Sequence, residues 1–253
     1  FFTDANTGYA SGIFGGIIKT TNGGTNWAPL SSGTMLTLNS VYFTDANTGY
    51  TVGSYGTIYK TTDAGANWIL KTKGTTNSLY SVYFNDGSTG YAAGSNGTIT
   101  KTTDGGVNWT MLNSGTNEWL YSIFFTDVNT GYAAGTGGTI FKTIDAGTVW
   151  TSLPTGITAG LSSIFFVNPD TGYAAGAYGT VLKTTDAGAS WTTVVTDSAN
   201  SFYAIHFPTA SIGYGVGYNG YIRKTSDGGA TWTTQNAGGT YLLKSVYFAN
   251  ANT

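Results

Sequence analysis

Residues 40–70 read SVYFTDANTGYTVGSYGTIYKTTDAGANWIL, and similar sequences recur along the whole chain at a fixed interval of 41 residues. The interval is visible in the tyrosine that follows a glycine, at Tyr9, Tyr50, Tyr91, Tyr132, Tyr173 and Tyr214. Self-similarity at one period without insertions is the signature of a repeat protein. The sequence therefore predicts six repeats, at about 1–39, 40–80, 81–121, 122–162, 163–203 and 204–244.

Each repeat alternates short runs of Val, Ile, Tyr, Phe and Thr with clusters of Gly, Asn and Asp. Such runs predict strands and such clusters predict tight turns. In the second repeat this gives strand A at 40–43, B at 50–53, C at 57–61 and D at about 67–71. Strand A is apolar on both faces, so both faces should be covered, as they are between stacked blades. We therefore expect an all-β chain, a single β-propeller domain over residues 1–253 with six four-stranded blades.

The two ends of the sequence overlap within the repeat. Residues 245–248 spell SVYF, a complete strand A, whereas Phe1 and Phe2 correspond only to the second half of that strand. The strand at 245–248 could therefore close the first blade as its innermost strand, which would remove an exposed sheet edge. The alternative is that the chain is a fragment of a seven-bladed propeller.

The turn between strands C and D carries the motif T-x-D-x-G-x-x-W, as in Thr61, Asp63, Gly65 and Trp68. An Asp or Asn side chain accepts hydrogen bonds from its own turn, Gly permits a positive φ, and Trp packs between sheets. We therefore interpret the motif as structural. Its members are Asn22, Asp63, Asp104, Asp145, Asp186 and Asp227, with Trp27, Trp68, Trp109, Trp150, Trp191 and Trp232.

This motif resembles the Asp-box (BNR) repeat of sialidases, sortilin-type receptors and photosystem II assembly-factor propellers. The blade text VYFTDANTGYTVGSYGTIYKTTDAGANW is most similar to the photosystem II assembly-factor family and its bacterial relatives, and the resemblance covers essentially the whole chain. It implies a β-propeller that binds membrane-protein segments in a chaperone-like way through an arginine-rich patch. The chain departs from that pattern because Arg223 is its sole arginine.

Composition excludes several classes of function. A net charge of -2 supplies no basic face for nucleic acid and no polybasic membrane patch, and no apolar run is long enough for direct membrane insertion. There is no cysteine, and the lone His206, in place of a strand A aromatic, is a poor metal ligand. We expect no cofactor and no metal, and interpret His206 as a packed core or channel residue. The Thr, Asn, Ser and Gly content suits a secreted or bacterial surface protein.

Catalysis would have to use carboxylates outside the repeat pattern. Glu118 and Asp197, both in D–A loops, form the one pair that could serve a glycosidase, which needs two carboxyl groups facing each other across about 5 to 10 Å. The resemblance to sialidases would require an arginine cluster as well, and the chain has one arginine and one glutamate. We expect no enzymatic activity, and an Asp-box glycoside hydrolase is the alternative.

The repeats differ most in the B–C turns and D–A loops, which topology places on one rim, opposite the A–B turns and Asp boxes. This predicted binding rim consists of Phe14, Tyr55, Tyr178 and Tyr218 in B–C turns and Glu118, Trp119 and Tyr241 in D–A loops. Exposed aromatic side chains offer contact area to proteins and sugars. We expect a non-catalytic binding or scaffolding module for a protein or glycan. A further alternative is an architectural repeat unit of a surface fibre or multidomain protein, in which self-assembly is possible.

Overall fold

The computed structural model describes residues 1–71, 74–195, 197 and 200–248. The chain divides into two compact units, Phe1–Ile123 and Phe124–Thr253, and each unit is described by itself. Among the described residues, no helix is long and apolar enough to cross a membrane.

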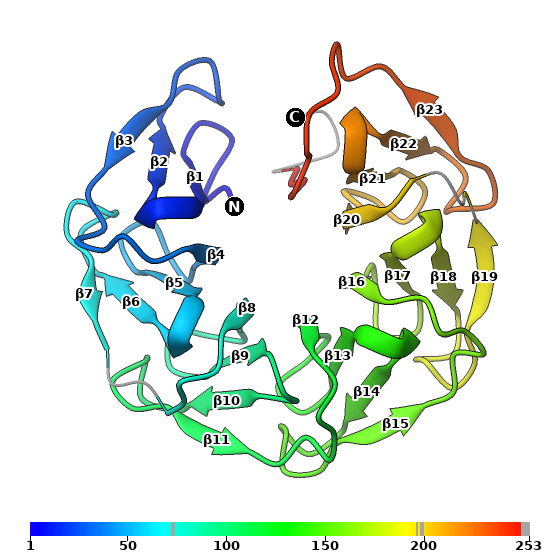
Figure 1. The fold of residues 1–253 in the computed structure, drawn as a ribbon, viewed down its shortest axis with the longest axis horizontal. Coiled ribbons are helices and arrows are strands. Elements are labelled where there is room, and N and C mark those ends of the chain that lie inside the picture. Colours follow the sequence, from blue (N-terminus) through cyan, green and yellow to red (C-terminus); the bar gives the residue numbers. More distant parts are fainter. Residues whose placement is uncertain (72–73, 196, 198–199, 249–253) are drawn as a thin grey trace. The chain divides into compact units, whose positions relative to one another are not determined.

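The first unit contains three antiparallel sheets whose neighbouring strands are consecutive in the chain (Figure 1). The first sheet has three strands, and the next two have four each, in the order A-B-C-D. The strands are β1(Gly8–Ser11), β2(Ile17–Thr20) and β3(Ala28–Leu30), then β4(Leu38–Phe43), β5(Gly49–Gly53), β6(Ile58–Thr61) and β7(Ile69–Leu70), then β8(Leu79–Phe84), β9(Gly90–Gly94), β10(Ile99–Thr102) and β11(Thr110–Leu112).

The second unit repeats the same up-and-down sheet three times. Its strands are β12(Leu120–Phe125), which begins just before the unit boundary, β13(Gly131–Gly135), β14(Ile140–Thr143) and β15(Thr151–Leu153), then β16(Leu161–Phe166), β17(Gly172–Gly176), β18(Val181–Thr184) and β19(Thr192–Val195), then β20(Phe202–His206), β21(Gly213–Gly217), β22(Ile222–Thr225) and β23(Thr233–Gln235). These sheets are propeller blades, so the predicted fold class, an all-β β-propeller with six blades, is confirmed.

Strand D is shorter than predicted, because part of it serves the Asp box. In the second repeat β7 covers only Ile69–Leu70, although strand D was expected at about 67–71. The amide of Asn67 donates to the carboxylate of Asp63 (2.9 Å) instead of joining the ladder, and Trp68 is buried between sheets. Lys71 still donates one ladder bond, to the carbonyl of Ile58 (2.9 Å).

The closing strand predicted at 245–248 does not form a strand in the structure. In the first unit, Phe1 and Tyr9 exchange two backbone hydrogen bonds (3.0 and 2.8 Å), and Phe2 forms a bridge to Gly8. Residues 245–248 instead pack by side chains within their own unit.

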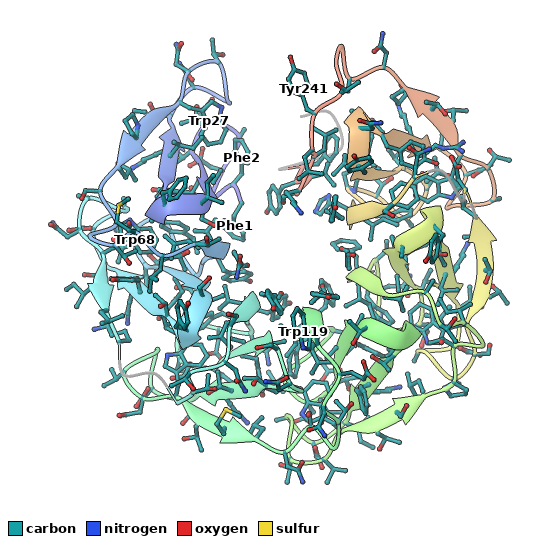
Figure 2. All side chains as sticks on the ribbon, in the orientation of Figure 1. Phe1, Phe2, Trp27, Trp68, Trp119 and Tyr241 are labelled. Atoms are coloured by element: carbon teal, nitrogen blue, oxygen red, sulfur yellow. The ribbon has the colours of Figure 1, made fainter. Side chains whose placement is uncertain are left out.

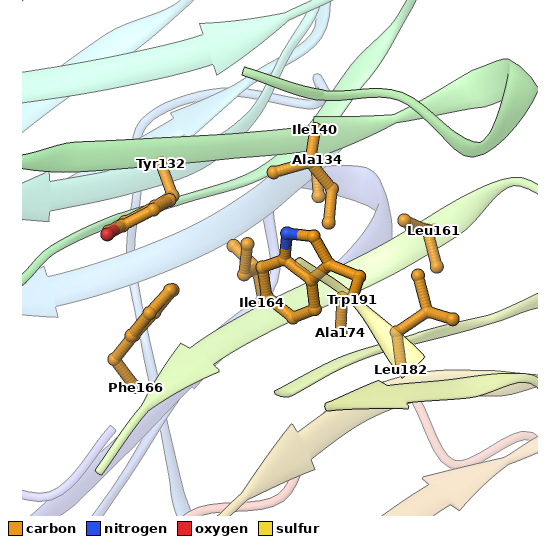
Figure 3. Packing of buried hydrophobic residues seen from close by; sticks show 9 residues of the cluster. All are labelled: Tyr132, Ala134, Ile140, Leu161, Ile164, Phe166, Ala174, Leu182 and Trp191. Carbon is orange, nitrogen blue, oxygen red and sulfur yellow. The ribbon is translucent and has the colours of Figure 1, made fainter. Parts of the chain in front are cut away.

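Three residue types of the repeat build the packing between successive blades. Tyr132 of β13 stacks on Phe166 of β16 with ring centroids 4.0 Å apart, and Trp191 meets the same phenylalanine edge-on at 6.1 Å. All three are buried, together with Ile140 and Leu161 (Figure 3). Burying side chains of this size stabilises the fold by roughly 2 to 3 kcal/mol each. The repeat tyrosine, phenylalanine and tryptophan thus act as one packing unit.

Candidate binding rim

The B–C turns and D–A loops are joined by backbone hydrogen bonds, so they lie at the same end of the sheets. The amide of Ser54 donates to the carbonyl of Thr37 (2.9 Å), and the amide of Gly97 donates to the carbonyl of Glu118 (2.7 Å). The second unit has the same type of bond, from Ala177 to Gly160 (2.8 Å). We keep the term binding rim for these turns and loops in each unit. Loops fixed on a rigid scaffold in this way are suited to present binding residues.

The B–C turns hold aromatic side chains in solvent on a left-handed backbone. Five of these turns are short 3₁₀ segments, η1(Ile13–Gly15), η2(Ser54–Gly56), η3(Thr136–Gly138), η4(Ala177–Gly179) and η5(Tyr218–Gly220). Their middle residues include Phe14 (φ 54°), Tyr55 (φ 56°) and Tyr178 (φ 55°), whose side chains are 69%, 65% and 63% exposed. Gly137 and Asn219 adopt the same conformation, and Gly and Asn tolerate it best. The turn requires a positive φ but does not require an aromatic ring.

The first unit also contains an aromatic cluster that spans two repeats. Trp119, just before β12, lies 5.9 Å from Tyr80 and 6.4 Å from Tyr121 between ring centroids, and the two tyrosines are 5.3 Å apart. Figure 2 labels Trp119, which is 45% exposed. Burial raises the pKa of Tyr80 and of Tyr121. We call Tyr80, Trp119 and Tyr121 the aromatic cluster.

A β-bulge sets the position of Tyr80. The register of β8 on β9 shifts between Leu79 and Ser81, so that Tyr80 is the extra residue of the pair. Bulges re-aim side chains and are frequent next to functional sites. The same shift occurs in β20 around Tyr203, which is the equivalent residue three repeats later.

In the second unit, a lysine contacts the tyrosine at this repeat position. The Nζ atom of Lys244 lies 3.7 Å from the ring centroid of Tyr203, and Lys244 is equivalent to Tyr121 in the repeat. Burial lowers the pKa of Lys244. Tyr241, a predicted rim residue of the same unit, is 64% exposed (Figure 2), and its carbonyl accepts from the amide of Gly220.

A shallow depression of about 470 Å³ lies beside the first B–C turn. Its walls include Phe14, Leu30, Ser32 and Met35, and Met35 is 75% exposed. The hydroxyl of Ser32 donates to the carbonyl of Gly15 (2.6 Å) and holds the turn against the loop. The rim of the first unit therefore has an apolar face next to a fixed turn.

The two carboxylates considered for hydrolysis lie in different units. The carboxylate of Asp197 accepts a hydrogen bond from Tyr221 Oη (2.9 Å) and lies 3.7 Å from Nη2 of Arg223. The sole arginine of the chain therefore neutralises an aspartate of its own unit. Glu118 is exposed, and its backbone carbonyl holds the B–C turn as described above. The hydrolase pair stays a hypothesis from the sequence.

The Asp boxes lie at the other end of the sheets and are engaged in their own turns. Asp63 Oδ1 accepts from Thr61 Oγ1 (2.8 Å) and from the amide of Asn67 (2.9 Å), and Asn22 accepts the equivalent bonds in the first repeat. Hydrogen bonds, first of all from the amide of Asn108, lower the pKa of Asp104 to about 2. These carboxylates stabilise turns, which accounts for their regular spacing.

The single histidine is packed among aromatic rings. His206 lies 4.9 Å from Phe165 and 5.1 Å from Tyr247 between ring centroids, and its Nδ1 atom is buried without a hydrogen-bond partner among the described residues. Burial lowers the pKa of His206 to about 4. The part of the chain that the structure describes contains no group of three or more His, Cys, Asp or Glu side chains that could hold a metal ion.

The blades and their Asp boxes define the chain as an Asp-box β-propeller that presents aromatic side chains on its turns. The family described as photosynthesis system II assembly factor YCF48 matches residues 25–115 and 107–199, and the chain belongs to this family. The expected resemblance is thereby confirmed. The description of the family names an assembly factor and no enzymatic reaction. No curated protein matches the chain by sequence.

Solved structures share the fold at low sequence identity. A structure titled "YCF48 bound to D1 peptide" is 20% identical with a TM-score of 0.76, over 92% of this chain and 78% of that one. YCF48 from Cyanidioschyzon merolae is 18% identical with a TM-score of 0.74, over 93% and 83%. The GH74 xyloglucanase from Xanthomonas campestris is 14% identical with a TM-score of 0.74, and this chain spans only 44% of its length. These similarities show the fold alone.

Tyr80, Tyr121 and Lys244 were not among the predicted rim residues. They hold the most variable position of strand A, which reads Asn39, Tyr80, Tyr121, Ser162, Tyr203 and Lys244 along the chain. The variation at this repeat position could therefore have indicated from the sequence that these residues belong to the rim. Their contacts could not be predicted, because these depend on the bulge and on the neighbouring repeat.

Proposed function

We propose that the chain is a non-catalytic binding module that recognises a protein segment through its binding rim. The observation that carries the proposal is the exposure of Phe14, Tyr55 and Tyr178 on left-handed turn residues. A left-handed backbone costs roughly 1 to 2 kcal/mol for a residue with a side chain. Gly or Asn would avoid most of that cost, so the rings are better explained by contact with a partner.

Four further facts support a protein as the partner. The family to which the chain belongs is described as an assembly factor, and one structural neighbour carries a bound D1 peptide according to its title. Aromatic side chains are also enriched in the centres of protein interfaces. The exposed Phe14 and Met35 beside the depression offer an apolar anchor point of the type that such interfaces use. A glycan stacked on the same rings is the alternative partner.

The test compares two triple variants. The rim variant carries Phe14→Asn, Tyr55→Asn and Tyr178→Asn, changes that suit the turn backbone. The control variant carries Val128→Asn, Ile144→Asn and Val149→Asn, which replace apolar residues that are 60%, 72% and 58% exposed at the A–B turn and Asp-box end. Both variants remove exposed apolar surface, but only one changes the rim.

A phage-displayed random peptide library and a glycan array are the probes. We expect peptides that bind the parent and the control variant with equal affinity and bind the rim variant at least about tenfold more weakly, a loss of roughly 1.4 kcal/mol. Selected peptides that bind the rim variant as well as the parent would refute the proposal. Binding of glycans and not of peptides would show that the rim recognises carbohydrates, which is the alternative function.

The location of the protein is a separate proposal. A secreted or cell-surface position is supported only by the Thr, Asn, Ser and Gly content and by the low content of charged residues (9%). Surface biotinylation of intact cells that express the native gene tests this location, and labelling only after lysis would contradict it.

A further inference from the structure

The aromatic cluster of the first unit brings three rings together, with centroids 5.3 to 6.4 Å apart. We propose that Tyr80, Trp119 and Tyr121 bind a lysine or arginine side chain of the partner segment. The identity of the partner as a protein rests on the proposed function above, but the cation site itself can be tested without it.

The three rings combine different orientations within a small volume. Trp119 and Tyr121 meet edge to face at an interplanar angle of 76°, while Tyr80 lies at 31° to Trp119 and 49° to Tyr121. Ring faces carry negative electrostatic potential, and Trp is the strongest attractor of cations. The tyrosines are half-buried and Trp119 is 45% exposed, so an incoming side chain can reach the indole.

The same repeat position in the second unit already contains such a contact. There Lys244 places its Nζ atom 3.7 Å from the ring centroid of Tyr203. Tyr203 corresponds to Tyr80 and Lys244 corresponds to Tyr121 in the repeat. The backbone around Tyr80 and Tyr203 is also equivalent, because both follow the same β-bulge. In the second unit, therefore, an ammonium group already packs against the ring of the tyrosine at this repeat position.

The net charge of the chain favours a cation over an anion. Glu118, the sole glutamate of the chain, precedes Trp119 and is exposed. Lys19 and Lys60 of the same unit donate to Asp-box carbonyls, at the other end of the sheets. The net charge of the chain is -2. A lysine or arginine at the cluster would gain the attraction of the ring faces.

Fluorine NMR on the whole chain tests the site directly. Labelling with 5-fluorotryptophan gives one signal for each of the seven tryptophans, and Trp119→Phe assigns the signal of Trp119. The probes are acetyl-Gly-Lys-Gly-amide, the same peptide with Nε-acetyllysine, and cellotetraose. The acetylated peptide keeps the length of the side chain and removes only its charge.

We expect the lysine peptide to shift the Trp119 signal alone, with an affinity at least about threefold higher than that of the acetylated peptide. Tyr80→Leu should abolish this preference and Tyr80→Phe should retain it, while the six other signals report that each variant is folded. An equal response to both peptides, a stronger response to cellotetraose, or no shift of Trp119 would overturn the proposal. Because the probes are small, this result is independent of whether the rim variant loses its protein partner.

Discussion

The rings of Tyr80 and Trp119 lie with centroids 5.9 Å apart, although the two residues belong to successive repeats. Tyr80 is the second residue of strand A of one blade, and Trp119 is the last residue of the loop that leads into strand A of the next. Each blade thus contributes one side of a contact that neither repeat contains alone. In a protein of near-identical repeats, such junctions are where a specific surface can arise.

We predict that Tyr178→Asn stabilises the second unit. Tyr178 holds φ at 55° with its ring 63% exposed, and Asn tolerates that backbone better, so the free energy of unfolding should rise by about 0.5 to 1 kcal/mol. Urea unfolding measures the change. Tyr241→Asn is the matched control, because Tyr241 is equally exposed without a positive φ, and it should have no effect. A loss of stability in Tyr178→Asn would show that the ring serves the fold.

We predict energetic coupling between Tyr50 and Lys60. Tyr50 Oη (2.9 Å) and Lys60 Nζ (2.7 Å) donate to the same buried carbonyl of Gly105, in the next blade. Tyr50→Phe and Lys60→Met should each cost about 1 kcal/mol, since one donor remains. The double variant should cost more than the sum, because the carbonyl then loses both donors. Strict additivity in urea unfolding would exclude this shared role, and Tyr55→Phe should leave stability unchanged.

We predict that His206 makes stability depend on pH. Burial lowers the pKa of His206 to about 4, below its ordinary value of 6.5, so the unfolded chain takes up a proton first as the pH falls. Stability should therefore be full above pH 6.5 and decrease from there toward pH 4.

His206→Phe restores the residue type of Phe124 and Phe165 at the same repeat position. It also removes a buried nitrogen without a partner, and should raise the free energy of unfolding at pH 7 by about 1 to 2 kcal/mol. Unfolding curves at pH 7.5 and 5.5 should differ more for the parent than for the variant, in which only the buried N-terminal amine, with its pKa lowered to about 6, still titrates in this range. A parent protein with the same stability at both values would contradict the burial of the imidazole.

We predict that the repeat tyrosines ionise late in the folded protein. Burial raises the pKa of Tyr50, Tyr91, Tyr132 and Tyr173 to about 12, from an ordinary value of 10. The unfolded chain therefore loses these protons first, and stability that is full below pH 10 should fall as the pH rises toward 12. Absorbance at 295 nm follows the titration. If all 18 tyrosines ionise together near pH 10 while the protein is folded, the predicted burial is wrong.

The sequence was sufficient to predict the blades, because the 41-residue period repeats the same strand and turn chemistry six times. Asp63 and Trp68 illustrate why: one completes its own turn and the other packs between sheets, and both roles follow from residue type and spacing. The closing strand could not be predicted from the sequence alone, since Phe1 and Phe2 match the last two positions of strand A as well as Tyr247 and Phe248 do. In the first unit, Phe1 pairs with Tyr9 and Phe2 forms a bridge to Gly8.

The rim was predicted only in part. Phe14, Tyr55 and Tyr178 could be placed on turns because each lies between turn glycines at a variable position. Their left-handed backbone gives that prediction an energetic argument that the sequence did not supply. Tyr80 and Tyr121 lie one residue before the predicted strand A of their repeats, and the one-residue bulge that positions Tyr80 could not be predicted from the sequence.

Hydrogen–deuterium exchange with a peptide selected on the parent protein is the most direct measurement of whether the rim binds the partner. We predict slower exchange at residues 12–16, 53–57, 117–121 and 176–180, which form B–C turns and a D–A loop of the rim, and no change at the Asp boxes around Asp63 and Asp186. Protection confined to the Asp-box end, with unchanged exchange at the rim, would contradict the proposed function.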